Sequence, residues 1–376
     1  MIDTLPIAVV ALPFAVAAAL ALIASWRIGS LMNAGCSSVV FVLTCALPWR
    51  TSDHLAQLTA FIAMTTSWYS RRDLAAGLQT RLLGQRRIQL YHIAFQMLLG
   101  ALLLALVVEQ PAATWPALAI AVGSAAAIVG VAGSGRDAAS RLLLLCGSGL
   151  TLALLGTLLL GTAPAPATIF FVLGYGGVAG LVPLHGWLAD AAAEAPAQGA
   201  ILVSALIVNA PLLLFMRLQT AIAPALLVAL GMVSLLFGGA MLLCRPGPHR
   251  AIAFGGMAQI GMIECAIGFS IGVTPRLIAM LALIRAAALQ GQGDYPTQFA
   301  AVLALALFPL FSLYLLAEPA AALSAWLLVP LSIGTLMTSY GLLLDIPNAA
   351  QTRNQAPLQL VPVWLELALA AGLAVA

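Results

Sequence analysis

The sequence predicts an all-α polytopic membrane protein with about 14 transmembrane helices. Of its 376 residues, 63% are hydrophobic and only 7% are charged, whereas roughly a quarter of the residues in a soluble domain are charged. The apolar residues also occur in runs of about 20, which is the length that a helix needs to cross a bilayer. This composition excludes a cytosolic enzyme, a secreted disulfide-rich protein and a nucleic-acid-binding protein.

Polar, proline-rich and glycine-rich breaks divide the chain into successive apolar segments. We expect spans at residues 5–24, 28–48, 54–69, 88–108, 112–132, 142–161, 167–193, 197–216, 221–243, 250–271, 276–290, 297–316, 320–344 and 358–375. Two of them are unusual, because 276–290 is short and 167–193 contains Pro183. The first segment lacks a basic n-region and a small-residue cleavage site, so we expect a retained helix rather than a signal peptide.

The arginines predict the orientation of the bundle. All 15 basic residues are arginine, and the largest cluster lies at 71–87, after the third span. Because positively charged loops remain in the cytoplasm, this loop is predicted to be cytoplasmic, and strict alternation places eleven of the 15 arginines on that side. We therefore expect a bacterial cell inner membrane protein with both termini on the periplasmic side. The cluster itself either meets anionic lipid headgroups or forms a docking surface for a soluble partner.

No pattern in the chain indicates a cofactor or metal site of its own. The five cysteines lie inside apolar runs without C-x-x-C spacing, so we expect small buried hydrophobic residues; they are Cys36, Cys45, Cys146, Cys244 and Cys265. A Walker loop and a G-x-G-x-x-G motif after a strand are both missing. We predict no bound cofactor, no metal and no catalytic site within this chain.

The most polar stretch of the chain lies at 174–217, where Pro183 interrupts an apolar span and His185, Trp187, Asp190 and Glu194 follow. A proline in a helix interior removes a backbone hydrogen bond, and in lipid the freed carbonyl needs another donor. Broken helices within a bundle are a common way to build an ion site. The alternative is a proline kink whose His and Asp lie at the membrane interface.

This stretch resembles the antiporter-like, proton-translocating membrane subunits of respiratory complex I, energy-converting hydrogenases and Mrp-type cation/proton antiporters. Members carry Gly-Tyr-Gly-Thr-Lys-x-Gly-Leu followed by Pro-x-His-x-Trp-Leu-Pro-Asp-Ala-His-x-Glu-Ala-Pro. Here GYGGVAGL starts at Gly174, PLHGWLAD at Pro183 and EAP at Glu194, with Asn209 and Arg217 continuing the match. The resemblance is greatest to the hydrogenase-4 membrane component F group.

A second match lies downstream and opens a later helix. Its residues are His249, Arg250, Ala253, Phe254, Gly255, Gly256, Gln259 and Gly261. The resemblance extends from about residue 60 to the C-terminus. It implies a single transmembrane domain over residues 1–376, an antiporter-like core at about 88–316 with at least one broken helix, and flanking helices at 1–69 and 320–376.

The titrating groups of this family are largely missing. Members move protons along an axis of buried lysine, histidine and glutamate, but Val178 stands at the broken-helix lysine and Gln259 at a later histidine. Arg285 cannot replace a lysine because its pKa stays above about 12. The remaining titratable groups near the interior are His185, Asp190, Glu194, Glu264, Asp294, Glu318 and Glu366.

Each candidate has two interpretations. His185 is either a surviving proton-carrying group or a structural histidine that fixes the kink. Glu264 either belongs to a polar path or makes an interhelical contact such as one with Arg285. Asp190 and Glu194, four residues apart, form an acidic face or a relay. The complete set of candidates for a proton path or broken-helix site is Pro183, His185, Asp190, Glu194, Asn209, Gln259, Glu264 and Arg285.

These observations predict a membrane subunit of a complex I-like or energy-converting hydrogenase-like complex, either structural or with a degenerate proton path. The expected partners are other membrane subunits, soluble redox subunits on the cytoplasmic side and the lipid bilayer, but no nucleic acid. Any oxidoreductase chemistry would belong to those partners, since no cluster-binding cysteines occur here. The alternative is a subunit of a non-redox ion transporter or cation/proton antiporter. Four tryptophans near predicted span ends, Trp26, Trp49, Trp115 and Trp187, are expected to be interfacial anchors.

Overall fold

A computed structural model of the chain describes residues 4–23, 25–47, 51–79, 83–108, 110–131, 135–159, 161–218, 222–244, 246–272, 274–290, 295–349 and 360–375. Every regular element in these ranges is helical, which confirms the predicted all-α class. The expectations placed on Trp49 and Asp294 fall outside the described residues.

The helices follow one another along the chain with short connections. They are α1 Thr4–Leu22, α2 Trp26–Cys45, α3 Thr51–Gln79, α4 Gln85–Val107, α5 Pro111–Val131, α6 Arg136–Leu159, α7 Pro164–Ala179, α8 Gly186–Glu194, α9 Ala197–Ile201, the π-helix η2 Leu202–Leu206, α10 Asn209–Arg217, α11 Pro224–Leu243, α12 Pro248–Gly268, α13 Thr274–Gln290, α14 Tyr295–Leu323, the 3₁₀-helix η3 Ala325–Leu327, α15 Leu328–Ala349 and α16 Leu360–Val375.

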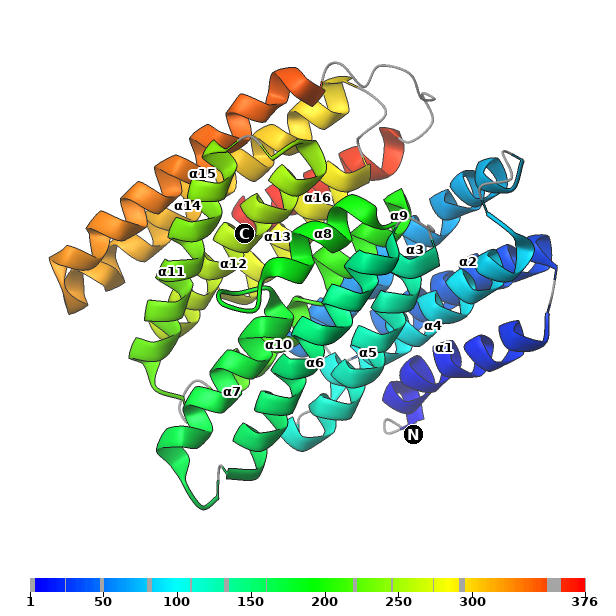
Figure 1. Cartoon of the computed structure of the whole chain (residues 1–376), viewed down its shortest axis with the longest axis horizontal. Helices are drawn as coiled ribbons and strands as arrows, with labels where there is room; N and C mark the ends of the chain where they lie inside the picture. The colour runs from blue at the N-terminus through cyan, green and yellow to red at the C-terminus, as the bar shows by residue number, and fades with distance from the viewer. Residues whose placement is uncertain are drawn as a thin grey trace.

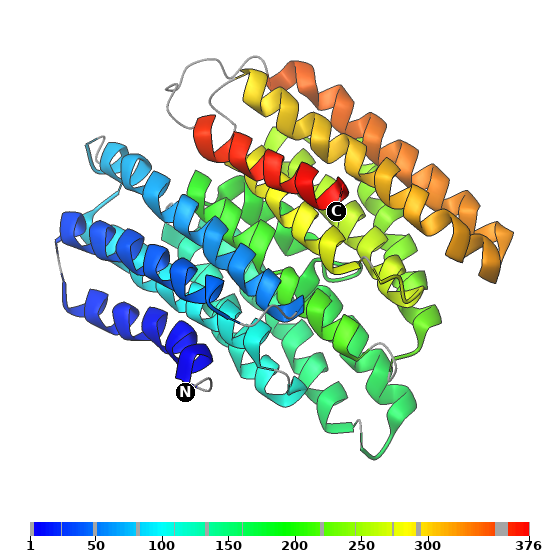
Figure 2. The same cartoon turned by 180° about the vertical axis from the view of Figure 1, so that it is seen from behind.

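Ten helical stretches in the described chain are long and apolar enough to cross a membrane: α1, α2, α4, α5, α6, α9 to α10, α11, α12, α14 and α15. Together with α3, the α7–α8 pair, α13 and α16, they correspond to the fourteen predicted segments. The helices run roughly side by side as one bundle (Figures 1 and 2). On the side shown in Figure 2, α16 crosses next to α13, while α14 and α15 form a long pair at the edge.

Two predicted boundaries were wrong. The third span was expected to end at 69, but α3 continues to Gln79 and contains Arg71 and Arg72. The spans expected at 297–316 and 320–344 divide instead at Ser324, because α14 continues to Leu323 with Pro309 and Pro319 inside it. A proline is tolerated in a transmembrane helix where neighbouring groups satisfy the freed backbone. Elsewhere proline begins a helix, as at Pro111 and Pro224, where its missing N–H costs nothing.

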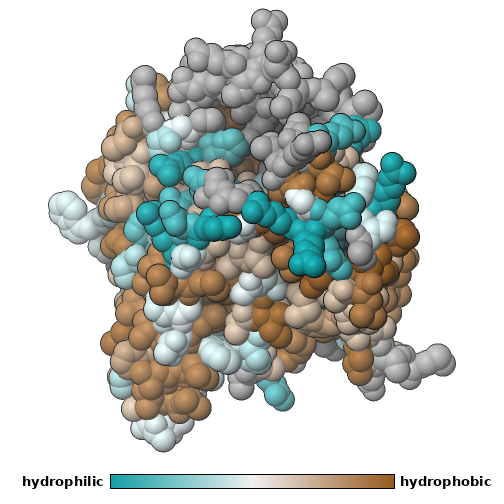
Figure 3. All heavy atoms as spheres, turned by 45° about the vertical axis from the view of Figure 1, so that its right-hand side comes forward, coloured by the Kyte–Doolittle hydropathy of each residue, from teal (hydrophilic) through white to brown (hydrophobic). Residues whose placement is uncertain are grey.

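The outer surface is apolar over most of the bundle, as a lipid-facing surface must be. Large side chains such as Leu144, Tyr314 and Trp326 are exposed, and Figure 3 shows hydrophobic walls below a band of hydrophilic side chains near one end. Two of the five cysteines follow this pattern, since Cys45 and Cys244 are exposed while the other three are buried. The prediction that all five are buried was therefore wrong for this pair, because the two cysteines lie at the exposed ends of α2 and α11.

Candidate functional site

The predicted broken helix is present, and a glycine sets where its first half ends. Gly180 has φ +84°, a left-handed conformation that glycine adopts without steric cost. The Leu181 N–H donates to the Gly176 carbonyl at 2.8 Å, and the Gly180 N–H donates to Gly177 at 3.1 Å, which is the Schellman arrangement. The chain then passes through a cis Val182–Pro183 bond before α8 starts at Gly186.

Side chains from two elements satisfy the backbone at the break. The Trp187 indole N–H donates to the Gly177 carbonyl at 2.8 Å, and the Val182 N–H donates to the Ser234 hydroxyl of α11 at 3.1 Å. Trp187 is fully buried, so the prediction of an interfacial anchor was wrong for this residue. Its indole N–H is used inside the bundle, where it gives the Gly177 carbonyl a second donor beside the Gly180 N–H.

His185 lies at the break and contacts α11. Its ring meets Phe237 edge-on, with centroids 4.5 Å apart. The histidine is partly buried, and its Nδ1 is a buried atom without a hydrogen-bond partner. Pro183 is exposed on the side of the bundle. Both interpretations of His185 remain compatible with this geometry.

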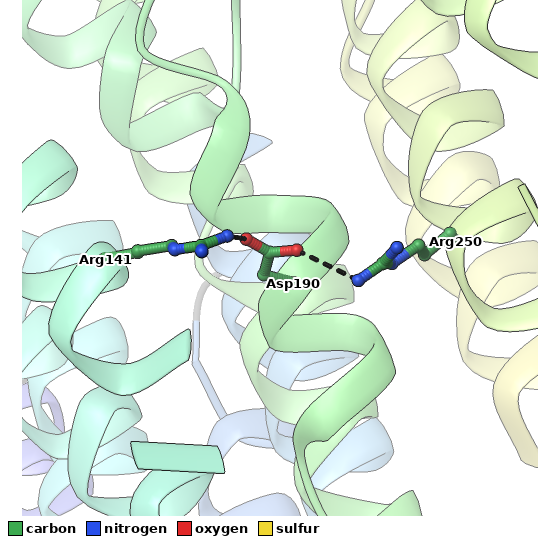
Figure 4. A network of polar contacts seen from close by, with 3 residues as sticks. All are labelled: Arg141, Asp190 and Arg250. Atoms are coloured by element: carbon green, nitrogen blue, oxygen red, sulfur yellow. Dashed lines mark hydrogen bonds and ion pairs between the residues drawn. The ribbon is translucent and has the colours of Figure 1, made fainter. Parts of the chain in front are cut away.

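Asp190 forms a bridge between three helices (Figure 4). Its carboxylate accepts from Arg141 of α6 at 2.6 Å and lies 3.4 Å from Arg250 of α12. The acid is 18% exposed, whereas the two arginine side chains are 63% and 48% exposed. Glu194, four residues further along α8, takes part in neither ion pair. The acidic pair is therefore not one solvated face: Asp190 holds α8 to its neighbours, and Glu194 does not.

The predicted polar residues after the broken helix occupy a second irregular segment. The π-helix η2 leads directly to Asn209, the first residue of α10. Asn209 is buried, and its amide nitrogen has no partner. Arg217 ends α10 and donates to the carbonyls of Leu106 and Val108 at the C-terminal end of α4. Its role is to satisfy helix-terminal carbonyls.

The remaining candidates lie on α12 and α13. Gln259 is buried and donates to the Leu305 carbonyl of α14. Glu264 and Arg285 are fully buried, yet neither has a hydrogen-bond partner. The guanidinium of Arg285 packs instead where a side chain at Gly256 would stand. The predicted contact between Glu264 and Arg285 was therefore wrong: the two side chains do not pair.

The structure brings Asp190 together with two arginines and joins His185 to the break, but Glu264 and Arg285 stay separate from both. It also reveals a cluster that was not predicted, in which Glu366 accepts from Gln290 and Thr65. The lone acid in the last apolar span was a usable sequence signal. Its partners were not, because Thr65 lies 301 residues away.

No metal cluster is present in the described part of the chain, where no three His, Cys, Asp or Glu side chains are grouped for an ion. In this geometry a hydrogen bond to α11 and the Asp190 ion pairs to α6 and α12 hold the broken helix in place inside an apolar bundle. A model of the NADH:quinone oxidoreductase/Mrp antiporter transmembrane family matches residues 149–289. Residues 149–289 are thus similar to the transmembrane segment of that family. This segment contains the broken helix and the α12 candidates.

Relatives and solved structures extend the similarity. The hydrogenase-4 component F homolog of Methylacidiphilum infernorum is 29% identical over 311 residues, which cover 69% of this chain. The chain spans 65% of the length of that relative. A chain of the archaeal membrane-bound sulfane sulfur reductase matches with a TM-score of 0.82 at 15% identity, covering 98% of this chain and 94% of that one.

A chain of respiratory complex I from Thermus thermophilus matches with a TM-score of 0.74 at 17% identity, covering 96% of both chains. At these identities the structural matches establish the fold alone. The resemblance to antiporter-like membrane subunits is confirmed, and with it an integral membrane protein of many apolar helices.

Proposed function

We propose that this chain is a membrane subunit of a complex I-like or energy-converting hydrogenase-like assembly and that its part is structural rather than pumping. Its partners would be other membrane subunits and soluble redox subunits on the cytoplasmic side. We further propose that it resides in a bacterial inner membrane with both termini on the periplasmic side.

The observation that carries a structural role is the environment of Val178. This residue occupies the last part of α7, directly before the break, and is fully buried. It stands where the resembling family has a lysine, and a valine cannot exchange a proton. Gln259, at the position of a family histidine, gives its amide N–H to a backbone carbonyl. Val178 therefore contributes packing and Gln259 contributes a hydrogen bond, where the family has side chains that exchange protons.

The surface around the break supports a neighbouring subunit. Pro183 is exposed, and Val182, Leu184, His185 and Gly186 are partly exposed. Irregular backbone at membrane depth is not tolerated against lipid; it must be covered by protein or line a water-filled cavity. A transmembrane helix of an adjacent subunit packed at this turn would satisfy that requirement.

Purification of the full chain from its native membrane tests the assembly. We expect homologous membrane subunits and iron–sulfur proteins to copurify in fixed ratio, identified by mass spectrometry. Recovery of the chain alone, or with non-redox proteins only, would contradict the proposal and favour an independent ion transporter.

Proton flux in reconstituted vesicles tests the structural role separately. Under a pH gradient we expect the chain to give no more flux than empty vesicles. Flux above that background would contradict the structural role. In that case His185→Ala and Glu264→Gln identify the path, because loss of flux in either variant would assign it to the broken helix or to α12.

A further inference from the structure

The best-organised polar cluster in the described interior lies away from the broken helix and outside residues 149–289. The Glu366 side chain, in the second turn of α16, is completely buried. Its Oε1 accepts from the Gln290 amide of α13 at 3.1 Å and lies 3.4 Å from the Thr65 hydroxyl of α3, whose proton it shares with the Ile62 carbonyl at 2.9 Å. Three helices distant in sequence therefore meet at one carboxyl group, on the side of the bundle shown in Figure 2.

No positive charge neutralises this carboxyl group. Among the described residues, Glu366 is hydrogen-bonded by the neutral side chains of Gln290 and Thr65, and Arg285, on the same helix as Gln290, has no hydrogen-bond partner. A buried carboxylate without a cation is strongly disfavoured. Two neutral donors offset only part of that cost, so the neutral acid is the stable form.

The unpaired atoms of the cluster point to a proton rather than a metal ion. Glu366 Oε2 and Gln290 Oε1 are both buried acceptors without a donor, and a proton on Glu366 would supply one. An oxygen-bound cation such as Ca²⁺ takes six or more oxygen ligands, and the Gln290 N–H groups beside the carboxyl would repel it. The cluster therefore fits a carboxylic acid that binds and releases a proton.

A polar stripe on α3 connects the cluster with the arginine-rich end of that helix. Thr65, Tyr69 and Asp73 follow one another at intervals of four residues, which places them on one helix face. Tyr69 is half-buried and lies within electrostatic reach of Glu366. Asp73 is partly exposed. The stripe thus runs from a fully buried acid to partly exposed groups.

We propose that Glu366, Gln290 and Thr65 form an internal proton-binding site that exchanges its proton along the Thr65–Tyr69–Asp73 face of α3. This proposal goes beyond the structural role, because binding a proton at α16 does not require conduction through the broken helix. The other charged or titratable groups on the helices packed around the site are Asp53, His54, Arg71 and Arg72 on α3, Arg276 and Arg285 on α13, and Tyr295, Tyr314 and Glu318 on α14.

Infrared difference spectroscopy of the purified full chain tests the site directly. Subtracting the spectrum of Glu366→Gln from that of the unsubstituted protein at neutral pH should reveal a protonated carboxyl C=O band that shifts in D₂O. Raising the pH should convert it to a carboxylate band. A carboxylate band already at neutral pH, or an acid band that never titrates, would overturn the proposal.

Further variants keep Glu366 and change its surroundings. Thr65→Val and Gln290→Leu each remove one donor, so the C=O band should move to higher frequency in both. Glu264, buried without a partner, is the matched control: its own band, assigned with Glu264→Gln, should not move.

To test exchange, Tyr69→Phe should slow the deuterium shift of the Glu366 band several-fold. An unchanged exchange rate would exclude the α3 route.

Discussion

Trp187 is buried at the break between α7 and α8 and hydrogen-bonds to the end of α7. Gly180 ends α7 in a left-handed conformation, and the Gly177 carbonyl accepts the Gly180 N–H at 3.1 Å in place of its usual partner four residues on. The buried indole N–H gives the same carbonyl a second, shorter hydrogen bond at 2.8 Å. Because Trp187 is also fully buried, one residue contributes both packing and a hydrogen bond.

We expect Trp187→Phe to destabilise the protein by about 0.5–1.5 kcal/mol, since it removes one buried hydrogen bond from the Gly177 carbonyl. The measurement is thermal unfolding in detergent, followed by circular dichroism. Trp326→Phe is the control, because Trp326 is 82% exposed and should tolerate the change. Equal stability of the Trp187 variant and the unsubstituted protein would show that the Gly180 N–H alone satisfies the carbonyl.

At the scale of helices, small residues decide which pairs approach most closely. Gly231 of α11 and Gly261 of α12 face each other, so that a Cβ on either would meet the carbonyl oxygen of the other. Without a hydrophobic driving force inside lipid, close backbone packing of this kind is a main source of helix association.

Gly261→Ala should therefore force α11 and α12 apart and cost about 1–3 kcal/mol by overpacking. Unfolding in detergent measures the loss. Gly147→Ala on α6 provides a matched control, since a Cβ there meets nothing within 4 Å. A Gly261 variant as stable as the Gly147 variant would mean that the crossing adjusts without strain.

The Asp190 bridge also belongs to this scale, because it ties α8 to α6 and α12. Exposed ion pairs contribute little and are weakened by salt. We expect Asp190→Asn to lower the melting temperature slightly at low salt and not at high salt. Glu194→Gln, which touches neither arginine, should have no effect at either salt concentration. A large, salt-independent loss would indicate that the bridge is screened from water.

For the whole molecule, orientation can be tested with two native cysteines. Cys45 ends α2 and Cys244 follows α11, both are exposed, and the proposed topology places them on opposite sides of the membrane. In intact cells with a permeable outer membrane, an impermeant maleimide should label Cys45 and spare Cys244. Cys45→Ala and Cys244→Ala assign the signals. The reverse pattern would invert the proposed topology.

Much of this molecule could be predicted from its sequence for one physical reason: a bilayer allows few structures. Apolar runs of membrane length and Pro183 are local features, and they predicted the helices and the broken segment. Lipid cannot satisfy backbone polar groups, so each long apolar run had to become a helix.

Tertiary packing alone decided which buried polar groups meet. Glu264 and Arg285 had complementary charges on successive helices, yet they do not pair. Glu366, an isolated acid in the last helix, finds its donors on α3 and α13. Hydropathy depends only on nearby residues, whereas a hydrogen bond depends on which helix faces touch. Those faces are set by side-chain shape and by glycine contacts across the bundle.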